Sequence, residues 1–542
     1  MLSCMALLVV LTKFWEISIL TTQGSQVVIE KQLSIAKGAA AKGDFQRAFM
    51  LFAELQKLNP KRGDVCFYFG AALLSVEEFD AAIKQLSLAC QLLPTQHEPL
   101  FKLADAFEIV NSVADVETVI KFALIQFPEH PEVIYRAANF YREVGQLSKA
   151  DKLATECITY SNDKLLSSYA WLLKLNLGQI QDINQAYDAL SALNNINPKL
   201  VNVSDNIPCS ASDSAIDKNL KMIVNYALGR YFELVNKTEL AFSHWKIANA
   251  LQLSMCDYRV NDLSALFTAI KANSTKPKIH SGKNSDFTPI FILGLPRTGS
   301  TLLEQMLCQH SDVSSLGEQP IIANQVANFA AHHAQQPYPL FMPELNTSKG
   351  QEICQQAAHI YDKAIKKRQL KTPFVIDKLP ANFQSIGFIK SLFPHAKIIH
   401  LTRQFADTGL SIFKNHFEAN EPYLCDLEEL SAYHQLHQNL MQHWQEIYQD
   451  EIFEMAYETL VSQPQAAIQQ VLTFCGLSHQ QQCWQNNDDD SDKHKIVRMI
   501  KTLSSAQVTE PVHQRAIGQH SKYAAYLKEN GLVDDQHNPP II

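Results

Sequence analysis

Paired cysteines are missing from this chain. Its 542 residues include eleven cysteines, an odd number scattered from Cys4 to Cys483, and none of them forms a C-x-x-C pair. This spacing fits neither a secreted disulfide scaffold nor a tetrahedral zinc site. The clustered histidines His434, His437 and His443 lack acidic or cysteine partners at ligand spacing, and we expect them on a solvated helix face. We therefore expect reduced thiols in a cytoplasmic protein and no bound metal.

An excess of positive charge is missing as well. The formal net charge is -8 at pH 7, and charged residues make up 19% of the chain. Proteins that bind nucleic acid through bulk charge carry the opposite sign. The composition therefore argues against a nucleic-acid partner, and any anion site has to be a local cluster of cations.

The first twenty residues lack a continuous apolar run long enough to span a membrane. Apolar stretches at 5–11 and 17–20 are separated by Lys13 and Glu16, and no basic segment precedes them. A spanning helix needs about 20 consecutive apolar residues, and a secretory signal begins with a basic region. We expect an apolar lead-in segment at 1–29. A membrane anchor through residues 1–20 is the alternative to a cytoplasmic location.

A period of 34 residues organises the first half of the chain. At this spacing, mostly small residues recur in two columns twelve positions apart, and a large apolar residue recurs in a third. The columns are Ala36, Gly70, Ala104 and Ala138; Ala48, Ala82, Val116 and Ala150; and Phe45, Phe79, Val113 and Leu147. Pro60, Pro94 and Pro128 close three successive units. Small residues let two antiparallel helices approach closely, and proline ends the second helix.

This pattern predicts a helical-hairpin solenoid over residues 30–252, and it resembles the tetratricopeptide repeat. The resemblance is clear up to about residue 160 and degenerate beyond it, although Gly229 and Ala241 restore the twelve-residue spacing. An unrelated helical bundle is the alternative. Helical solenoids commonly present extended binding surfaces. The repeats could therefore recruit a protein partner or join two chains in a homodimer, and the residues do not select between these roles.

The pattern changes after residue 252. Residues 253–286 lose the repeat and end in a polar, turn-rich stretch, so we assign them as a linker. Short apolar runs then alternate with long helical stretches, at 287–293, 374–376, 397–401 and 452–457. This alternation predicts an α/β domain over 287–542 with a mostly parallel sheet and covering helices. Ligands of such sheets bind at the carboxyl ends of the strands.

The first of these predicted strands leads into a glycine-rich turn. Residues 294–301 read Gly-Leu-Pro-Arg-Thr-Gly-Ser-Thr, the spacing of a phosphate-binding loop, but Ser300 stands where a nucleotide triphosphatase has lysine. The apolar stripe that follows predicts a helix beginning at this turn. Free backbone N–H groups at a helix N-terminus bind phosphate or sulfate. The turn is therefore a candidate anion site, and a tight turn without a ligand is the alternative.

Three cations stand where the predicted strands end. Arg297 lies in the glycine turn, Lys378 follows the run 374–376, and Arg403 follows the run 397–401. A single cation at a strand end is usually a solvated tip. Three of them around a glycine turn, in an acidic chain, predict a site for a small anion with several charges.

These residues resemble the sulfotransferases that use 3′-phosphoadenosine 5′-phosphosulfate (PAPS). The resemblance is strongest to the tyrosylprotein branch and its bacterial relatives with tetratricopeptide repeats, and it covers about residues 287–517. It implies a P-loop-like sulfotransferase domain and PAPS as co-substrate, without a metal. The loop residues that would bind the 5′-phosphosulfate are Arg297, Thr298, Gly299, Ser300 and Thr301. Arg403 and Ser411, eight residues apart, match the pair that holds the 3′-phosphate of PAPS.

The same resemblance assigns the catalytic residues. Lys378 matches the family lysine that contacts the transferred sulfuryl group, and Tyr457 matches a tyrosine that binds PAPS. Ser505 matches a serine near the reacting sulfate. Glu318, seventeen residues past the loop, matches the general base of the tyrosylprotein branch. The implied catalytic set is Glu318, Arg297, Lys378 and Ser505.

Two departures from the family pattern concern the substrates. Gln319 follows Glu318 where the tyrosylprotein branch has an arginine that helps to bind acidic peptides. The acceptor hydroxyl could therefore belong to a protein tyrosine, a sugar or a small alcohol. Gln519 stands where the family usually has a basic residue, and His520 or Lys522 could replace that phosphate contact.

Two other functions remain open from the residues. The run 374–377 also resembles the strand and aspartate that hold magnesium in P-loop NTPases and kinases, although Ser300 replaces their lysine. A third possibility is a repeat scaffold with an inactive catalytic domain. The intact set of cations with Glu318 argues against such decay.

Overall fold

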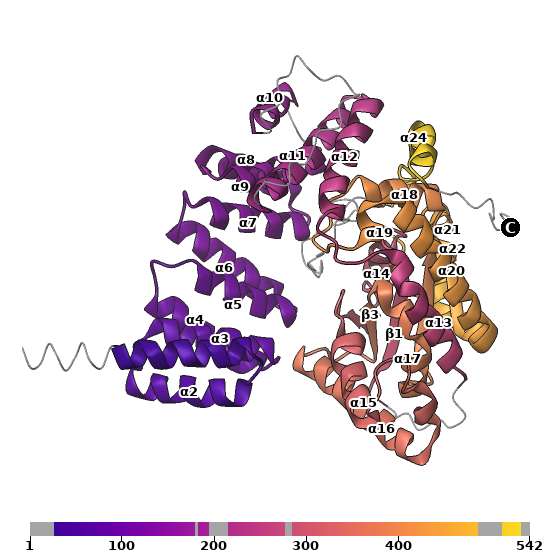
Figure 1. Ribbon diagram of the computed structural model, residues 1–542, viewed down its shortest axis with the longest axis horizontal. Helices are drawn as coiled ribbons and strands as arrows, with labels where there is room; N and C mark the ends of the chain where they lie inside the picture. Colours follow the sequence, from indigo (N-terminus) through magenta and orange to yellow (C-terminus); the bar gives the residue numbers. More distant parts are fainter. Residues whose placement is uncertain (1–26, 179–182, 194–214, 277–284, 486–511, 533–542) are drawn as a thin grey trace, which may run out of the picture. The chain divides into compact units, whose positions relative to one another are not determined.

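A computed structural model describes residues 27–178, 183–193, 215–276, 285–485 and 512–532 of the chain (Figure 1). It divides into two compact units, residues 1–128 and 129–542. Most of the predicted lead-in segment and Ser505 lie outside the described residues. Of the helices within these ranges, none is long and apolar enough to cross a lipid bilayer.

The first unit is a stack of helical hairpins, as the 34-residue period predicts. Its helices cover residues 27–41, α2 (Phe45–Leu58), α3 (Gly63–Ser75), α4 (Phe79–Leu92), α5 (Glu98–Ile109) and α6 (Val113–Gln126). Ala36, Ala48 and Ala82 of the small-residue columns are fully buried. A methyl group added to Gly70 would lie 2.7 Å from Leu86 Cγ, so glycine permits the close approach of α3 and α4. The small columns therefore form the helix contacts.

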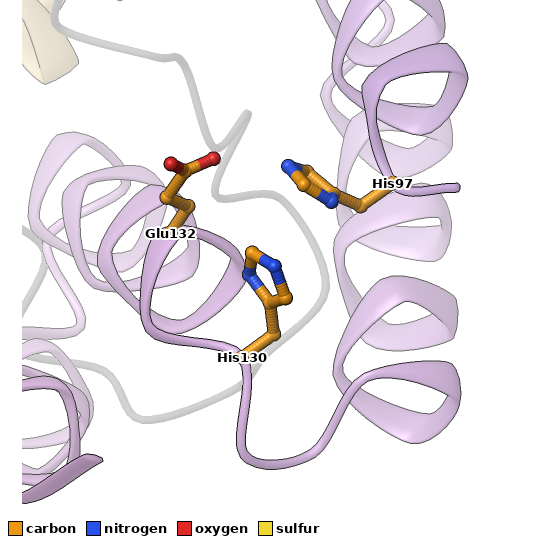
Figure 2. Close-up of side chains that lie close together, drawn as sticks. All are labelled: His97, His130 and Glu132. Carbon is orange, nitrogen blue, oxygen red and sulfur yellow. The ribbon is translucent and has the colours of Figure 1, made fainter. Parts of the chain in front are cut away.

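A histidine stands directly before each of two repeat helices, and the first turn of each helix contains a proline and a glutamate. His97 precedes α5, and His130 precedes α7 (Pro131–Glu143), whose first turn carries Glu132 (Figure 2). Acidic side chains in a first turn complement the positive end of the helix dipole. His97 belongs to the first compact unit, whereas His130 and Glu132 belong to the second.

The second unit begins with further repeat helices and continues into the α/β domain. The repeat helices are α7, α8 (Leu147–Tyr160), α9 (Lys164–Leu177), α10 (Ile183–Leu193), α11 (Ala215–Leu234) and α12 (Thr238–Leu253). Gly229 contacts Trp245 closely, since an added methyl group would lie 2.3 Å from the indole. The segment assigned as a linker at 253–286 holds two helical elements, η1 (Val260–Leu263) and α13 (Ser264–Asn273).

The α/β domain contains a five-stranded parallel sheet in the order β2-β3-β1-β4-β5, which confirms the predicted class. The strands are β1 (Thr288–Gly294), β2 (Val313–Ser315), β3 (Phe374–Lys378), β4 (Lys397–Thr402) and β5 (Ile452–Ala456). Four of them coincide with the predicted apolar runs. The three-residue strand β2 did not stand out in the sequence, because it is too short to show a pattern.

Helices cover both faces of the sheet (Figure 1). Ile290 and Ile292 of β1 pack with α14 (Ser300–Leu307) and α22 (Pro464–Cys475). Phe291 and Leu293 point to the opposite core, which includes α16 (Ser348–Lys367), α17 (Ile386–Leu392) and α20 (Leu427–Tyr448). Both faces of β1 are thus buried, as expected for a parallel strand between helical layers.

The remaining elements connect these layers. They are η2 (Ile322–Val326), α15 (Ala327–Ala334), η3 (Met342–Asn346), η4 (Pro380–Ser385), α18 (Phe405–Phe413), α19 (Pro422–Cys425), η5 (Gln449–Glu451), α21 (Tyr457–Ser462), η6 (Gln481–Cys483), η7 (Gln519–Tyr523) and α24 (Ala524–Glu529). One prediction in this part was wrong. His437 of α20 is buried against Phe383 instead of facing solvent, because apolar residues surround it on the helix.

The last repeat pair packs directly on the α/β domain. Asn249 Nδ2 donates to the carbonyl of Phe413 at 2.7 Å, and Gln252 Nε2 donates to that of Phe417, also at 2.7 Å. These carbonyls lie at and just after the end of α18, where a helix leaves its last carbonyls without internal partners. Phe242 of α12 also stacks on Phe413. Helix α12 therefore supplies hydrogen-bond donors to carbonyls at and just after the C-terminal end of α18.

Candidate active site

The turn after β1 is tight and can be formed only by particular residues. Gly294 has φ +145°, and a Cβ there would lie 2.4 Å from the carbonyl oxygen of Leu401 on the neighbouring strand β4. Gly299 has φ +97°, and Arg297 also has a positive φ, of 68°. Positive φ is uncommon outside glycine and clusters at functional sites. Thr298 Oγ1 braces the turn by donating to the carbonyl of Leu295 at 2.8 Å.

Helix α14 starts at Ser300, directly after this turn. Ser300 and Thr301 are buried, and the first backbone N–H groups of the helix lie at the carboxyl end of β1. This end of the helix carries a partial positive charge. The predicted arrangement of strand, glycine turn and helix is present.

Two arginines and a serine from distant segments meet beside the turn. Arg297 Nε donates to Ser411 Oγ of α18 at 3.0 Å. Arg403, just after β4, donates through Nη1 to the carbonyl of Arg297 at 3.0 Å. Its guanidinium stands over the ring of Tyr457, 4.6 Å from the centroid. The same ring packs against Gly299, where an added Cβ would lie 2.5 Å from the ring. Five predicted site residues are thus brought together.

The surroundings of Arg297 disfavour its positive charge. Burial, together with the positive charge of Arg403, lowers the pKa of Arg297 to about 10. Within the described ranges, the buried Nε of Arg403 has no hydrogen-bond partner. An anion placed between the two groups would relieve the repulsion and accept this N–H. The cluster is therefore chemically suited to a phosphate or sulfate group.

A second charged cluster lies at the end of β3. Lys378 is 1% exposed, and its ammonium forms an ion pair with Oε1 of Glu318. The Glu318 side chain is 42% exposed, so a substrate can reach its carboxylate. The charge of Glu318 also acts on Arg297, which indicates that the two clusters are neighbours. The structure thus pairs the predicted base with the predicted catalytic lysine.

Glu304 of α14 is a site residue that the sequence analysis missed. Its buried carboxylate lies 3.6 Å from Lys378 Nζ and accepts a hydrogen bond from Ser315 Oγ. The sequence carries no clear signal for it, because Glu304 lies beside the apolar face formed by Leu302, Leu303 and Met306 and is buried only by tertiary contacts. A buried carboxylate almost never lacks a partner, and here the partner is Lys378.

Asp377, the residue before Lys378, is fully buried and points away from any solvent. Its carboxylate accepts hydrogen bonds from Tyr361 Oη at 3.0 Å and from Asn382 Nδ2 at 2.9 Å. Burial raises the pKa of Asp377 to about 7. These contacts make it a structural group inside the fold.

The C-terminal part of the domain closes over Arg403. Arg403 Nη2 donates to the carbonyl of Ala516 at 2.6 Å. The buried carboxylate of Asp407 holds this segment, because it accepts from the backbone N–H of Gly518 at 2.6 Å and of His520 at 2.8 Å. Gln519, at the family's basic position, turns instead to the carbonyl of Arg515.

His520, one suggested replacement for the missing basic residue, is already engaged. Its Nδ1 lies 2.9 Å from Asp407 Oδ1, and its Nε2 lies 3.4 Å from Gln404 Nε2. Lys522, the other suggested replacement, is exposed.

Comparison with known proteins connects this site to a family. Residues 289–481 match the model of the sulfotransferase family. A protein of Aquifex aeolicus without an assigned function is 24% identical over 430 residues, covering 77% of this chain and 52% of its own length. A protein-tyrosine sulfotransferase of Drosophila melanogaster is 23% identical over 291 residues, covering 52% of this chain and 56% of its own length. The chain thus spans about half the length of these two relatives.

Two solved structures are also similar to parts of the chain. The sulfotransferase domain of the Synechococcus PCC 7002 olefin synthase is 18% identical with a TM-score of 0.28, covering 48% of this chain and 99% of that domain. The MamA protein is 15% identical with a TM-score of 0.25, covering 39% of this chain and 92% of that protein.

The matched residues contain the sheet, the glycine turn and both charged clusters. The repeats that precede them show the 34-residue period and the helical hairpins of a tetratricopeptide-like array. The α/β part of the chain, over residues 289–481, therefore matches the sulfotransferase family, and it follows tetratricopeptide-like repeats.

Proposed function

We propose that this chain transfers the sulfuryl group of PAPS to an acceptor hydroxyl. The observation that carries the proposal is the cluster of Arg297, Ser411 and Arg403 beside the start of α14. It combines two half-buried cations with a helix N-terminus, and both features favour phosphate and sulfate groups. The match of residues 289–481 to the sulfotransferase family supports the same conclusion.

The nucleotide would be held at two points. The turn Arg297–Thr301 and the first N–H groups of α14 would bind the 5′-phosphosulfate, while Arg403 and Ser411 would bind the 3′-phosphate. Tyr457, which supports Arg403 and packs on Gly299, would order both parts of this site. The buried Nε of Arg403 offers a donor to the 3′-phosphate. Ser505 stays a predicted contact with the reacting sulfate.

The reaction needs one base and several cations. The acceptor oxygen would form the new bond to sulfur while its proton passes to the carboxylate of Glu318. The bond between sulfur and the bridging oxygen would break, and its electron pair would remain on the 5′-phosphate of adenosine 3′,5′-bisphosphate. Lys378 and Arg297 would stabilise this developing negative charge, which is the main catalytic contribution expected for such a transfer.

The contacts of Asp377 disfavour an NTPase or kinase. A magnesium-binding aspartate has to face the phosphates, whereas Asp377 is enclosed by Tyr361 and Asn382. Ser300 moreover stands at the position of the lysine that would reach the β- and γ-phosphates. PAPS has no β- and γ-phosphates, so its binding needs neither a magnesium-binding aspartate nor that lysine.

The proposal extends to the sequence around the acceptor hydroxyl and to the partner of the repeats. Uncharged residues 319–323 follow Glu318, and they favour an acceptor without a strongly acidic surrounding sequence. The repeats, proposed over 30–252, would bind a protein partner or a second copy of the chain.

Reverse transfer gives a direct test. Purified protein is mixed with adenosine 3′,5′-bisphosphate and 4-nitrophenyl sulfate, and the release of 4-nitrophenol is followed by absorbance. We expect release that depends on the bisphosphate and that is strongly reduced, to a measurable residual rate, in Lys378→Ala. Release that ATP with magnesium supports equally well, or no release at all, would contradict the proposal.

A further inference from the structure

Glu304 stands at the centre of a closed set of contacts around the proposed reaction site. Ser315 Oγ donates to Oε1 of Glu304, and the N–H of Gly317 donates to Ser315 Oγ at 2.9 Å. The N–H of Lys378 donates to the carbonyl of Gly317 at 3.2 Å. Oε2 of Glu304 completes the set at 3.6 Å from Lys378 Nζ. One carboxylate therefore contacts both the lysine and the segment that leads to Glu318.

We propose that Glu304 is a positioning residue that holds the ammonium of Lys378 in place and fixes the segment bearing Glu318. The proposal rests on the proposed function, because it gives Glu304 a role in the same sulfuryl transfer. It adds a residue from α14, the helix of the anion-binding turn. This helix thereby connects the PAPS site to the base.

The argument depends on the different surroundings of the two carboxylates. Glu304 is 4% exposed, whereas the side chain of Glu318 is 42% exposed and can meet an acceptor. When Glu318 takes the proton of the acceptor hydroxyl, it becomes neutral and no longer balances Lys378. Glu304 cannot reach solvent and remains as the carboxylate that balances the buried ammonium. A buried charge that loses its partner is strongly unfavourable.

The geometry also separates this role from binding of the nucleotide. Arg297, Ser411, Arg403 and Tyr457 form their contacts without Glu304. Replacement of Glu304 by glutamine keeps the shape and the acceptor for Ser315, and it puts an uncharged NH2 group in place of the oxygen that faces Lys378. The variant should therefore lose turnover while it retains the nucleotide.

The first experiment measures reverse transfer with 4-nitrophenyl sulfate in Glu304→Gln. We expect kcat to fall about 10- to 100-fold, the loss seen when groups that orient metal ligands are removed. The dissociation constant for adenosine 3′,5′-bisphosphate should stay within about twofold. Glu352→Gln, which removes an exposed carboxylate from α16, is the matched control and should change neither value. An unchanged kcat in Glu304→Gln, or a lost nucleotide affinity, overturns the assignment.

A double-mutant cycle tests whether Glu304 acts through Lys378. In the Lys378→Met background, Glu304→Gln should have no further effect on kcat, because the ion pair is already absent. The same cycle followed by thermal unfolding needs no turnover, and the double variant should be less destabilised than the sum of the single variants. Additive shifts in both measurements overturn the pairing. Wild-type protein that releases no 4-nitrophenol contradicts the proposed function, while the unfolding cycle still decides whether the two residues are coupled.

Discussion

Arg403→Ala should weaken the binding of adenosine 3′,5′-bisphosphate without unfolding the protein. Arg403 lies over the ring of Tyr457 and donates to the carbonyl of Arg297, which in turn donates to Ser411. The 3′-phosphate is proposed to bind beside these residues. The substitution removes a charged donor from that phosphate. Hydrogen bonds to charged groups contribute about 1.5–3 kcal/mol each. The dissociation constant should therefore rise about 10- to 100-fold.

The structure also indicates how to separate this loss from a local disturbance. Arg403 holds the backbone of the turn through the carbonyl of Arg297 and the C-terminal segment through that of Ala516. Arg403→Lys keeps the positive charge but lacks the planar guanidinium fork. It should bind the bisphosphate more weakly than the wild type and more tightly than Arg403→Ala.

Isothermal titration calorimetry measures the three affinities directly. Lys349→Ala changes the net charge by the same amount at an exposed position of α16, and its affinity should equal that of the wild type. Thermal unfolding of each variant shows whether the fold is retained. An Arg403→Ala variant that remains folded and binds the bisphosphate as tightly as the wild type would refute the placement of the 3′-phosphate.

Three further predictions concern the base, a buried acid and the domain boundary. Glu318→Gln should lower kcat by about 10²- to 10⁴-fold, the contribution of a positioned base, and leave bisphosphate affinity unchanged; normal turnover in the reverse assay would remove Glu318 from the reaction. Because folding raises the pKa of Asp377 to about 7, the fold disfavours its ionised form, and the unfolding free energy should fall by roughly 4 kcal/mol relative to Asp377→Asn between about pH 4 and about pH 7. Chemical denaturation at several pH values measures this difference, and a pH-independent difference would contradict it. A fragment of residues 287–542 lacks Asn249 and the rest of α12, so it should be less soluble and unfold at a lower temperature than residues 129–542; equal unfolding temperatures would show that α12 is dispensable.

The sequence was sufficient to predict those helices, strands and site residues whose pattern repeats or has a characteristic spacing. The 34-residue columns predicted the helical hairpins, and the apolar runs predicted four of the five strands. The glycine turn and its resemblance to a family also singled out Arg297, Ser411 and Arg403, whose contacts come from three separate segments.

Features that depend on tertiary packing were not visible in the sequence. Strand β2 has only three residues, and its pairing with β3 defines it. Glu304 looks like an ordinary helix residue until Lys378 is placed beside it. The contacts of α12 with the end of α18 join segments more than 160 positions apart. Local sequence patterns do not predict contacts between segments so far apart in the chain.

The measurement that tests the central claim most directly is the nucleotide preference of the wild-type protein. Titration calorimetry compares adenosine 3′,5′-bisphosphate, adenosine 5′-monophosphate and ATP with magnesium on the same preparation. Because Arg403 and Ser411 are proposed to hold the 3′-phosphate, the bisphosphate should bind with a micromolar dissociation constant, and removal of its 3′-phosphate should weaken binding at least about tenfold. Tighter binding of ATP with magnesium, or equal binding of the bisphosphate and the monophosphate, would contradict a PAPS site.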